Sequence, residues 1–131
     1  MSKVLVIDDD DLVRDTFVQM LTRAGFEVAT AKNGREGLAR FRSESPDVIM
    51  TDVIMPDQDG IETIMALRQA SSTIPIIAIS GGGRAHVMQF LDAAQKLGAD
   101  MVLSKPIKQP ELISAISRVL EIGAGRKSRS S

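Results

Sequence analysis

The stretch VLVIDDDD, residues 4–11, joins four apolar residues directly to four carboxylates. The acidic half carries four like charges in a row, whereas the apolar half is typical of a buried strand. Further apolar runs follow along the chain, and they do not alternate with polar residues either. These runs are 26–31, 48–50, 74–79 and 101–103. Continuous apolar runs of this length indicate strands that are buried on both faces, as in a parallel sheet.

The segments between these runs carry apolar residues at helical spacing. The helical stripes lie within 13–24, 37–41, 61–67, 87–97 and 112–120. Asp10 or Asp11 is expected to cap the first helix, and Asn33 the second. Gly25 and Gly98 follow the predicted ends of two helices, where glycine is common. A strand followed by a helix, repeated five times, predicts an α/β fold with parallel strands, right-handed crossovers and helices on both faces of the sheet.

The composition restricts the class of protein. The chain has 131 residues, which is the length of one domain, with 44% hydrophobic and 25% charged residues. A net charge of −1 and the absence of Trp and Tyr argue against nucleic-acid binding and against a polybasic membrane patch. The lack of cysteine excludes disulfides, thiolate metal sites and a cysteine nucleophile. With no apolar stretch long enough for a membrane span and no signal peptide, we expect a soluble, cytoplasmic protein.

The end of the chain differs from the rest. Residues 123–131, GAGRKSRSS, are small and basic, and we expect them to form a disordered tail. Residues 1–122 are then expected to form the folded domain.

Polar side chains lie at the carboxyl ends of the predicted strands. Asp8 and Asp9 follow the first strand, and Asp52 follows the third. Ser80 ends the fourth strand, and Lys105 follows the fifth. Ligands of open parallel sheets bind beyond these ends, near the point where the strand order reverses. Because the first and third strands are neighbours in the flavodoxin-type order, we expect the three aspartates to share one crevice.

Three carboxylates in one crevice raise one another's pKa unless a cation compensates them. A hard divalent ion such as Mg²⁺ suits this oxygen-rich site, whereas the lack of nearby His or Cys disfavours zinc and copper. The Ser80 hydroxyl and the Lys105 ammonium could share the charge of a phosphoryl group, and one Asp could accept that group as an acyl phosphate. Taken alone, an acidic run is more typical of a helix start than of a metal site. The conjunction of these residues at the correct strand ends favours the phosphoryl site.

Four motifs in order, VLVIDDD, VIMTDVIMPDQDG, PIIAISGGG and GADMVLSKPI, resemble those of response-regulator receiver domains of two-component signalling, the CheY-like superfamily. The resemblance covers about residues 3–121. It implies a flavodoxin-like (βα)5 fold, a doubly wound parallel sheet with strand order 2-1-3-4-5. It also implies a signalling domain rather than an enzyme. In that family, Asp52 would accept a phosphoryl group from a sensor histidine kinase or a phosphotransfer protein, and hydrolysis would reset the switch.

The resemblance also assigns the remaining site residues. Asp8, Asp9, Asp52 and the backbone carbonyl of Ile54 would hold Mg²⁺. Ser80 would move toward the phosphoryl group. Lys105 would pair with the acceptor, and its peptide bond to Pro106 is expected to be cis. Phosphorylation would then change how the fourth helix, fifth strand and fifth helix bind a downstream protein target. We expect a monomer, with dimerisation on phosphorylation as an open alternative.

The sequence departs from the family at Val102, where receivers usually carry Tyr or Phe three residues before the lysine. The aromatic switch is therefore missing. Movement of Ser80 would be transmitted through the loop that follows it and the fourth helix, or the output differs from the usual kind. That loop begins GGGR, residues 81–84, and we hypothesise that it is the main moving part, with a simple flexible connection as the alternative. It lacks the spacing of a P-loop, and His86 is interpreted as a surface residue.

Three other functions stay open. A Mg²⁺-dependent phosphatase of the haloacid-dehalogenase type also uses an Asp at a strand end, but residues 8–10 fit its D-x-D motif only loosely. A degenerate receiver that acts only as a docking module would not need the intact acidic residues. An FMN-binding module usually carries aromatic residues beside the flavin. The chain is expected to be a stand-alone receiver, or one cut from a longer protein, that acts by protein contact or as a phosphorelay intermediate.

Overall fold

The structure is a computed structural model that describes residues 2–53, 60–81 and 92–130. Five parallel strands form one sheet in the order β2-β1-β3-β4-β5. The strands are β1 (Lys3–Ile7), β2 (Glu27–Ala31), β3 (Val48–Asp52), β4 (Ile76–Ser80) and β5 (Met101–Ser104). The labelled helices are α1 (Asp11–Arg23), α2 (Gly34–Glu44), α3 (Gly60–Ala70) and α5 (Gln109–Ser130). Residues 92–97 are also helical. The α/β class and the predicted strand order are confirmed.

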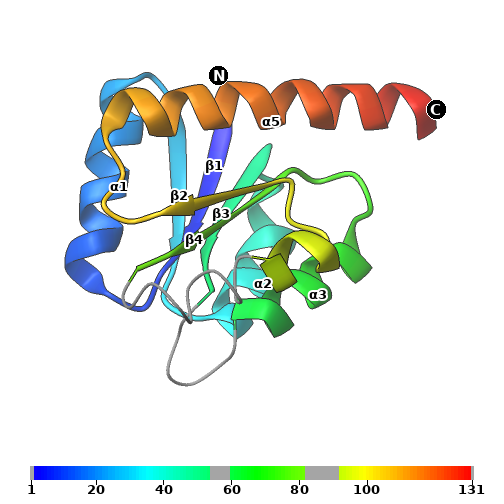
Figure 1. The fold of residues 1–131 in the computed structure, drawn as a ribbon, viewed down its shortest axis with the longest axis horizontal. Coiled ribbons are helices and arrows are strands. Elements are labelled where there is room, and N and C mark those ends of the chain that lie inside the picture. Colours follow the sequence, from blue (N-terminus) through cyan, green and yellow to red (C-terminus); the bar gives the residue numbers. More distant parts are fainter. Residues whose placement is uncertain (1, 54–59, 82–91, 131) are drawn as a thin grey trace.

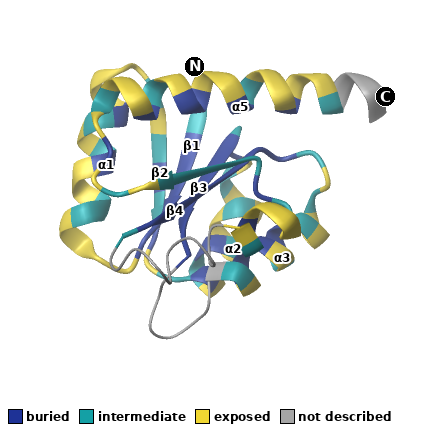
Figure 2. Cartoon of the chain, viewed as in Figure 1, coloured by how far each residue is buried: buried dark blue, intermediate teal, exposed yellow. Residues whose placement is uncertain are grey.

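The sheet divides the core into two layers. Leu5 and Ile7 of β1 pack on the side of α2 and α3, whereas Val4 and Val6 pack on the side of α1 and α5. Side chains alternate along a strand in this way, so a strand covered on both faces must be apolar throughout. Figure 1 shows the two helical layers, and Figure 2 shows β1, β3 and β4 buried between them. β5 is only partly buried, as its place at the edge of the sheet requires.

The helix starts carry the capping residues that the sequence suggests. Asp10, rather than Asp11, is the N-cap of α1, and its carboxylate accepts hydrogen bonds from the amides of Leu12 and Val13. Asn33 caps α2 and accepts a hydrogen bond of 2.8 Å from the amide of Glu36. These caps satisfy amides that the helix itself leaves unpaired. Asp10 therefore serves as the cap of α1.

The sequence predicts a disordered tail from residue 123, whereas the structure describes a helix over 123–130. α5 continues as a helix to Ser130. Two contacts stabilise this continuation: Gly123 packs closely against Pro75, and Arg126 forms an ion pair with Asp100. None of the described helices is long and apolar enough to cross a membrane.

The strand register places the carboxyl ends of the strands at one edge of the sheet. Ile7 of β1 pairs with Thr51 of β3, so the next residues, Asp8 and Asp52, leave the sheet at the same level. Ser80 ends β4, which is the other neighbour of β3. This edge is the usual ligand site of a doubly wound sheet.

Candidate functional site

Three aspartates meet at this edge, as predicted. One carboxylate oxygen from each of Asp8, Asp9 and Asp52 lies within 4.8 Å of the others. Asp8 and Asp52 are buried, with 1% and 6% of their surface exposed, whereas Asp9 is exposed. Two buried carboxylates at this separation repel each other strongly unless positive charge is nearby.

Lys105 provides part of that charge. Its Nζ lies 3.0 Å from Oδ2 of Asp8 and 3.1 Å from Oδ2 of Asp52, so one ammonium bridges two strands. Burial lowers the pKa of Lys105, but the charges and hydrogen bonds of Asp52 and Asp8 outweigh it, and the net shift is upward. The lysine is therefore cationic at neutral pH. The predicted cis peptide bond between Lys105 and Pro106 is also present.

One ammonium does not neutralise three carboxylates, so the site has an excess of negative charge. Carboxylate oxygens are the ligands that Mg²⁺ prefers, and it commonly binds through a few of them with water and phosphate oxygens completing its shell. The donor set of Asp8, Asp9 and Asp52 therefore fits a hard divalent cation. The fourth predicted ligand, the carbonyl of Ile54, lies outside the described residues, as do residues 82–84 of the glycine loop and His86.

Ser80 is buried at the end of β4, and among the described residues its hydroxyl has no hydrogen-bond partner. A buried hydroxyl without a partner costs free energy, so such groups are uncommon away from functional sites. β4 lies next to β3, the strand that carries Asp52. The backbone carbonyl of Ser80 accepts a hydrogen bond of 2.7 Å from the amide of Lys105. Gly81 follows, and a Cβ there would lie 3.1 Å from Cδ of Lys105. The missing side chain leaves room for the lysine.

A contact that the sequence reasoning missed fixes the backbone of the acidic loop. The guanidinium Nη1 of Arg14 donates a hydrogen bond of 2.8 Å to the carbonyl of Asp8, and the Nη2 group pairs with Asp11. The amide of Asp10 donates to Oδ1 of Asp8 at 2.9 Å. Together these contacts hold Asp8 where its carboxylate faces Lys105. An arginine that binds a main-chain carbonyl leaves no motif, so the role of Arg14 cannot be predicted from the sequence.

An apolar groove of about 500 Å³ opens beside Lys105. Its walls come from α1 and from the connection between β5 and α5. The lining residues are Leu12, Val13, Thr16, Phe17, Met20, Gly81, Lys105, Pro106 and Ile107. Leu12, in the first turn of α1, is 80% exposed at the edge of this groove.

Comparison with known proteins gives the family. A model of the response regulator receiver domain matches residues 4–117. The chain belongs to this family. The receiver is 36% identical over 124 residues to the transcriptional regulatory protein CpxR homolog of Haemophilus influenzae, which covers 95% of this chain and 52% of that protein. It is 34% identical over 119 residues to the chemotaxis protein CheY of Halobacterium salinarum, which covers 90% of this chain and 96% of that protein.

The fold comparison agrees with the family. A solved receiver domain from Clostridium thermocellum superposes over the full length of both chains with a TM-score of 0.83 at 28% identity. The receiver spans about half the length of the regulator from Haemophilus influenzae that it matches. Receivers of this family work with sensor kinases and downstream effectors. The family match argues against the alternatives of a haloacid-dehalogenase phosphatase and an FMN module.

Proposed function

We propose that this receiver accepts a phosphoryl group on Asp52 in a Mg²⁺-dependent reaction and thereby switches its binding to a downstream protein. The observation that carries the proposal is the position of Lys105, whose ammonium bridges Asp8 and Asp52 beside the exposed carboxylate of Asp9. A docking module with no chemistry would not require two buried carboxylates with a half-buried cation between them.

Asp52 is the favoured acceptor because its strand lies in the middle of the site. β3 is flanked by β1, which carries the other two aspartates, and by β4, which ends at Ser80. Asp8, Asp9, Asp52 and the carbonyl of Ile54 are proposed as the metal ligands, since one carboxylate oxygen from each of the three aspartates lies within 4.8 Å of the others. When bound, Mg²⁺ would neutralise the carboxylates and polarise the phosphoryl oxygens.

The transfer itself is a substitution at phosphorus. A carboxylate oxygen of Asp52 forms a bond to phosphorus while the bond from phosphorus to the imidazole nitrogen of the donor breaks. The electron pair of that bond stays on the nitrogen, which takes a proton from solvent. Lys105 stabilises the charge on the equatorial oxygens, and the Ser80 hydroxyl donates a hydrogen bond to one of them. Water later attacks the acyl phosphate, which releases inorganic phosphate and returns Asp52 to the carboxylate.

The donor is proposed to be a phosphohistidine of a sensor histidine kinase or of a phosphotransfer protein. The apolar groove beside Lys105 would take the apolar side chains of that protein, with Leu12 as the exposed contact. The downstream target would bind the face made by the fourth helix, β5 and α5, which changes when Ser80 forms its new hydrogen bond. The protein is proposed to act in the cytoplasm, as a monomer in its unphosphorylated state.

Beryllofluoride, a mimic of the aspartyl phosphate, tests the site. Added with Mg²⁺, it is expected to raise the melting temperature of the wild type, because a ligand that binds only the folded state stabilises it. Asp52→Asn and Asp9→Asn are expected to abolish or weaken this rise. Asp15→Asn, which removes an exposed carboxylate from α1, is the matched control. A rise that is the same in Asp52→Asn as in the wild type would contradict the proposal.

A further inference from the structure

One acidic side chain holds the last turns of α5 against the body of the receiver. Asp100 lies just before β5, and both of its carboxylate oxygens accept hydrogen bonds from the guanidinium of Arg126. The contact from Nη2 to Oδ2 measures 3.0 Å. The side chain of Arg126 is 26% exposed and that of Asp100 is 11% exposed, so water reaches little of this pair. The planar guanidinium of an arginine can donate two parallel hydrogen bonds to one carboxylate in this geometry.

The same carboxylate also fixes the start of β4. Its Oδ2 accepts the amide of Ile76 at 2.9 Å, and the amide of Asp100 donates to the carbonyl of Ile76 at 2.8 Å. Asp100 is thus a junction between the end of α5 and the amino ends of two neighbouring strands.

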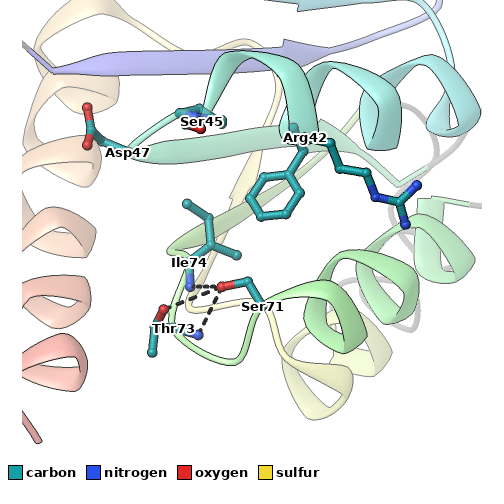
Figure 3. Close-up of a pocket in the computed structure, with 8 residues that line it drawn as sticks. Arg42, Ser45, Asp47, Ser71, Thr73 and Ile74 are labelled. Atoms are coloured by element: carbon teal, nitrogen blue, oxygen red, sulfur yellow. Dashed lines mark hydrogen bonds between the residues drawn. The ribbon is translucent and has the colours of Figure 1, made fainter. Parts of the chain in front are cut away.

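Arg126 reaches the connection between α3 and β4 as well. It donates to the carbonyl of Thr73 at 3.0 Å and to that of Ile74 at 3.2 Å, while Arg68 donates to the carbonyl of Ile74 at 2.8 Å. The amides of Thr73 and Ile74 bind the hydroxyl of Ser71, as Figure 3 shows at the rim of a small hollow. Hydrogen bonds from three side chains therefore stabilise this connection: those of Ser71, of Arg68 on α3 and of Arg126 on α5.

The helix reaches this connection because a side chain is missing. A Cβ at Gly123 would lie 2.5 Å from Cγ of Pro75, closer than any ordinary contact. Glycine is a poor helix former, yet it lies inside α5 where the helix comes closest to Pro75. Its presence there indicates that close packing of α5 on Pro75 outweighs the loss of helix propensity. Figure 1 shows that the C-terminal end of α5 extends past the strands of the sheet.

We propose that Arg126 is a latch, which by pairing with Asp100 couples the last turns of α5 to β4, the strand that ends at Ser80. With the latch closed, the direction of the last turns of α5 is fixed relative to the sheet. β4 is only five residues long and buried throughout, so it links the latch at its first residue to the phosphoryl site at its last. Two events that act on one element influence each other reciprocally. This coupling rests on the proposed function, whereas the latch itself does not.

Hydrogen exchange followed by mass spectrometry tests the latch on the full chain. Arg126→Gln is expected to speed hydrogen exchange of the amides in 121–126 about tenfold. The substitution removes the charge-assisted hydrogen bonds to Asp100 that hold these residues against the sheet. Arg118→Gln, which changes an exposed arginine on the same helix, is the control and should leave exchange unchanged. Equal exchange in the two variants would overturn the latch.

The coupling has its own measurement. Beryllofluoride with Mg²⁺ is expected to change exchange of 121–126 by at least about twofold in the wild type and by less in Arg126→Gln. If melting curves show that the mimic binds but exchange in this segment is unchanged, the coupling is overturned and the latch stands. If the mimic does not bind, the proposed function fails, and the coupling that rests on it is withdrawn. The comparison of Arg126→Gln with Arg118→Gln still decides the latch.

Discussion

At the scale of single residues, the site depends on how buried charges are balanced. The pKa of Lys105 is raised in the folded state because Asp52 and Asp8 outweigh the effect of burial. The stabilisation from this shift is fully present below the unfolded pKa of about 10.4 and is lost as the pH rises through the folded value. Lys105 therefore keeps its charge through the physiological range, and the proposed Mg²⁺ would be the variable partner of the carboxylates.

Arg14 is predicted to support metal binding without touching the metal. Arg14→Ala is expected to weaken Mg²⁺ binding about tenfold, because the carbonyl of Asp8 loses the contact that orients the acidic loop. Arg14→Lys should recover part of the affinity. Isothermal titration measures both. Arg23→Ala, an exposed arginine on the same helix, is the control, and the same affinity in both alanine variants would refute this role.

Asp100 is predicted to make stability depend on pH in acid. Burial raises its pKa, but hydrogen bonds from Arg126 and Ile76 outweigh it, so the folded pKa is below the usual value. The stabilisation is present above the unfolded pKa of about 3.9 and is lost as the pH falls through the folded pKa. Asp100→Asn should therefore reduce the free energy of unfolding by about 1–2 kcal/mol at pH 7. Urea titrations should show this difference shrinking below about pH 4, and a constant difference would contradict it.

At the scale of elements, α5 contains two glycines with opposite surroundings. A Cβ at Gly123 would collide with the ring of Pro75, whereas a Cβ at Gly125 would meet nothing within 4 Å. Alanine favours a helix over glycine by about 1 kcal/mol, and overpacking costs about 1–3 kcal/mol. An alanine at position 125 therefore changes only the helix propensity, whereas an alanine at position 123 changes both the propensity and the packing on Pro75.

Gly125→Ala is predicted to raise the free energy of unfolding by up to about 1 kcal/mol, since only the helix propensity changes. Gly123→Ala is predicted to lower it by about 1 kcal/mol, because the cost of displacing Pro75 exceeds the gain in propensity. Denaturant titrations of the two variants measure both effects. If Gly123→Ala were as stabilising as Gly125→Ala, α5 would not be held against Pro75.

The groove on α1 is predicted to serve the protein donor alone. Leu12→Ser removes an exposed apolar contact but leaves the aspartates and Lys105 in place. Transfer from a phosphohistidine protein should slow about tenfold, since a buried leucine at an interface is worth about 1.5 kcal/mol or more. The rate with acetyl phosphate, which needs no docking, should not change. Equal slowing with both donors would place Leu12 in the chemical site and contradict its docking role.

At the scale of the whole molecule, much of the architecture was predictable because parallel strands carry a strong signal. Apolar runs buried on both faces indicate the sheet, and their carboxyl ends predict the meeting of Asp8, Asp52 and Lys105 that the structure has. The helical continuation after residue 122 was not predictable, since its small and basic composition favours disorder. Its order comes from two tertiary contacts of Gly123 and Arg126, which local sequence does not encode.

The proposed phosphoryl site thus lies at one end of β4, and the junction with α5 lies at the other. Ser80 lies at the carboxyl end, beside the acidic cluster. Ile76 lies at the amino end, where it bonds with Asp100. We propose this short buried strand as the route between phosphorylation and the last turns of α5, and the exchange measurements with the mimic test that coupling.

The central claim is that Asp52 is the phosphoryl acceptor, and borohydride trapping tests it most directly. The receiver is incubated with acetyl phosphate and Mg²⁺ and then reduced, which converts an aspartyl phosphate to homoserine, and the modified residue is located by peptide mass spectrometry. We predict homoserine at position 52 in the wild type, none without Mg²⁺, and none in Asp52→Asn. Homoserine at another aspartate of the wild type, or no modification at all with Mg²⁺ present, would contradict the claim.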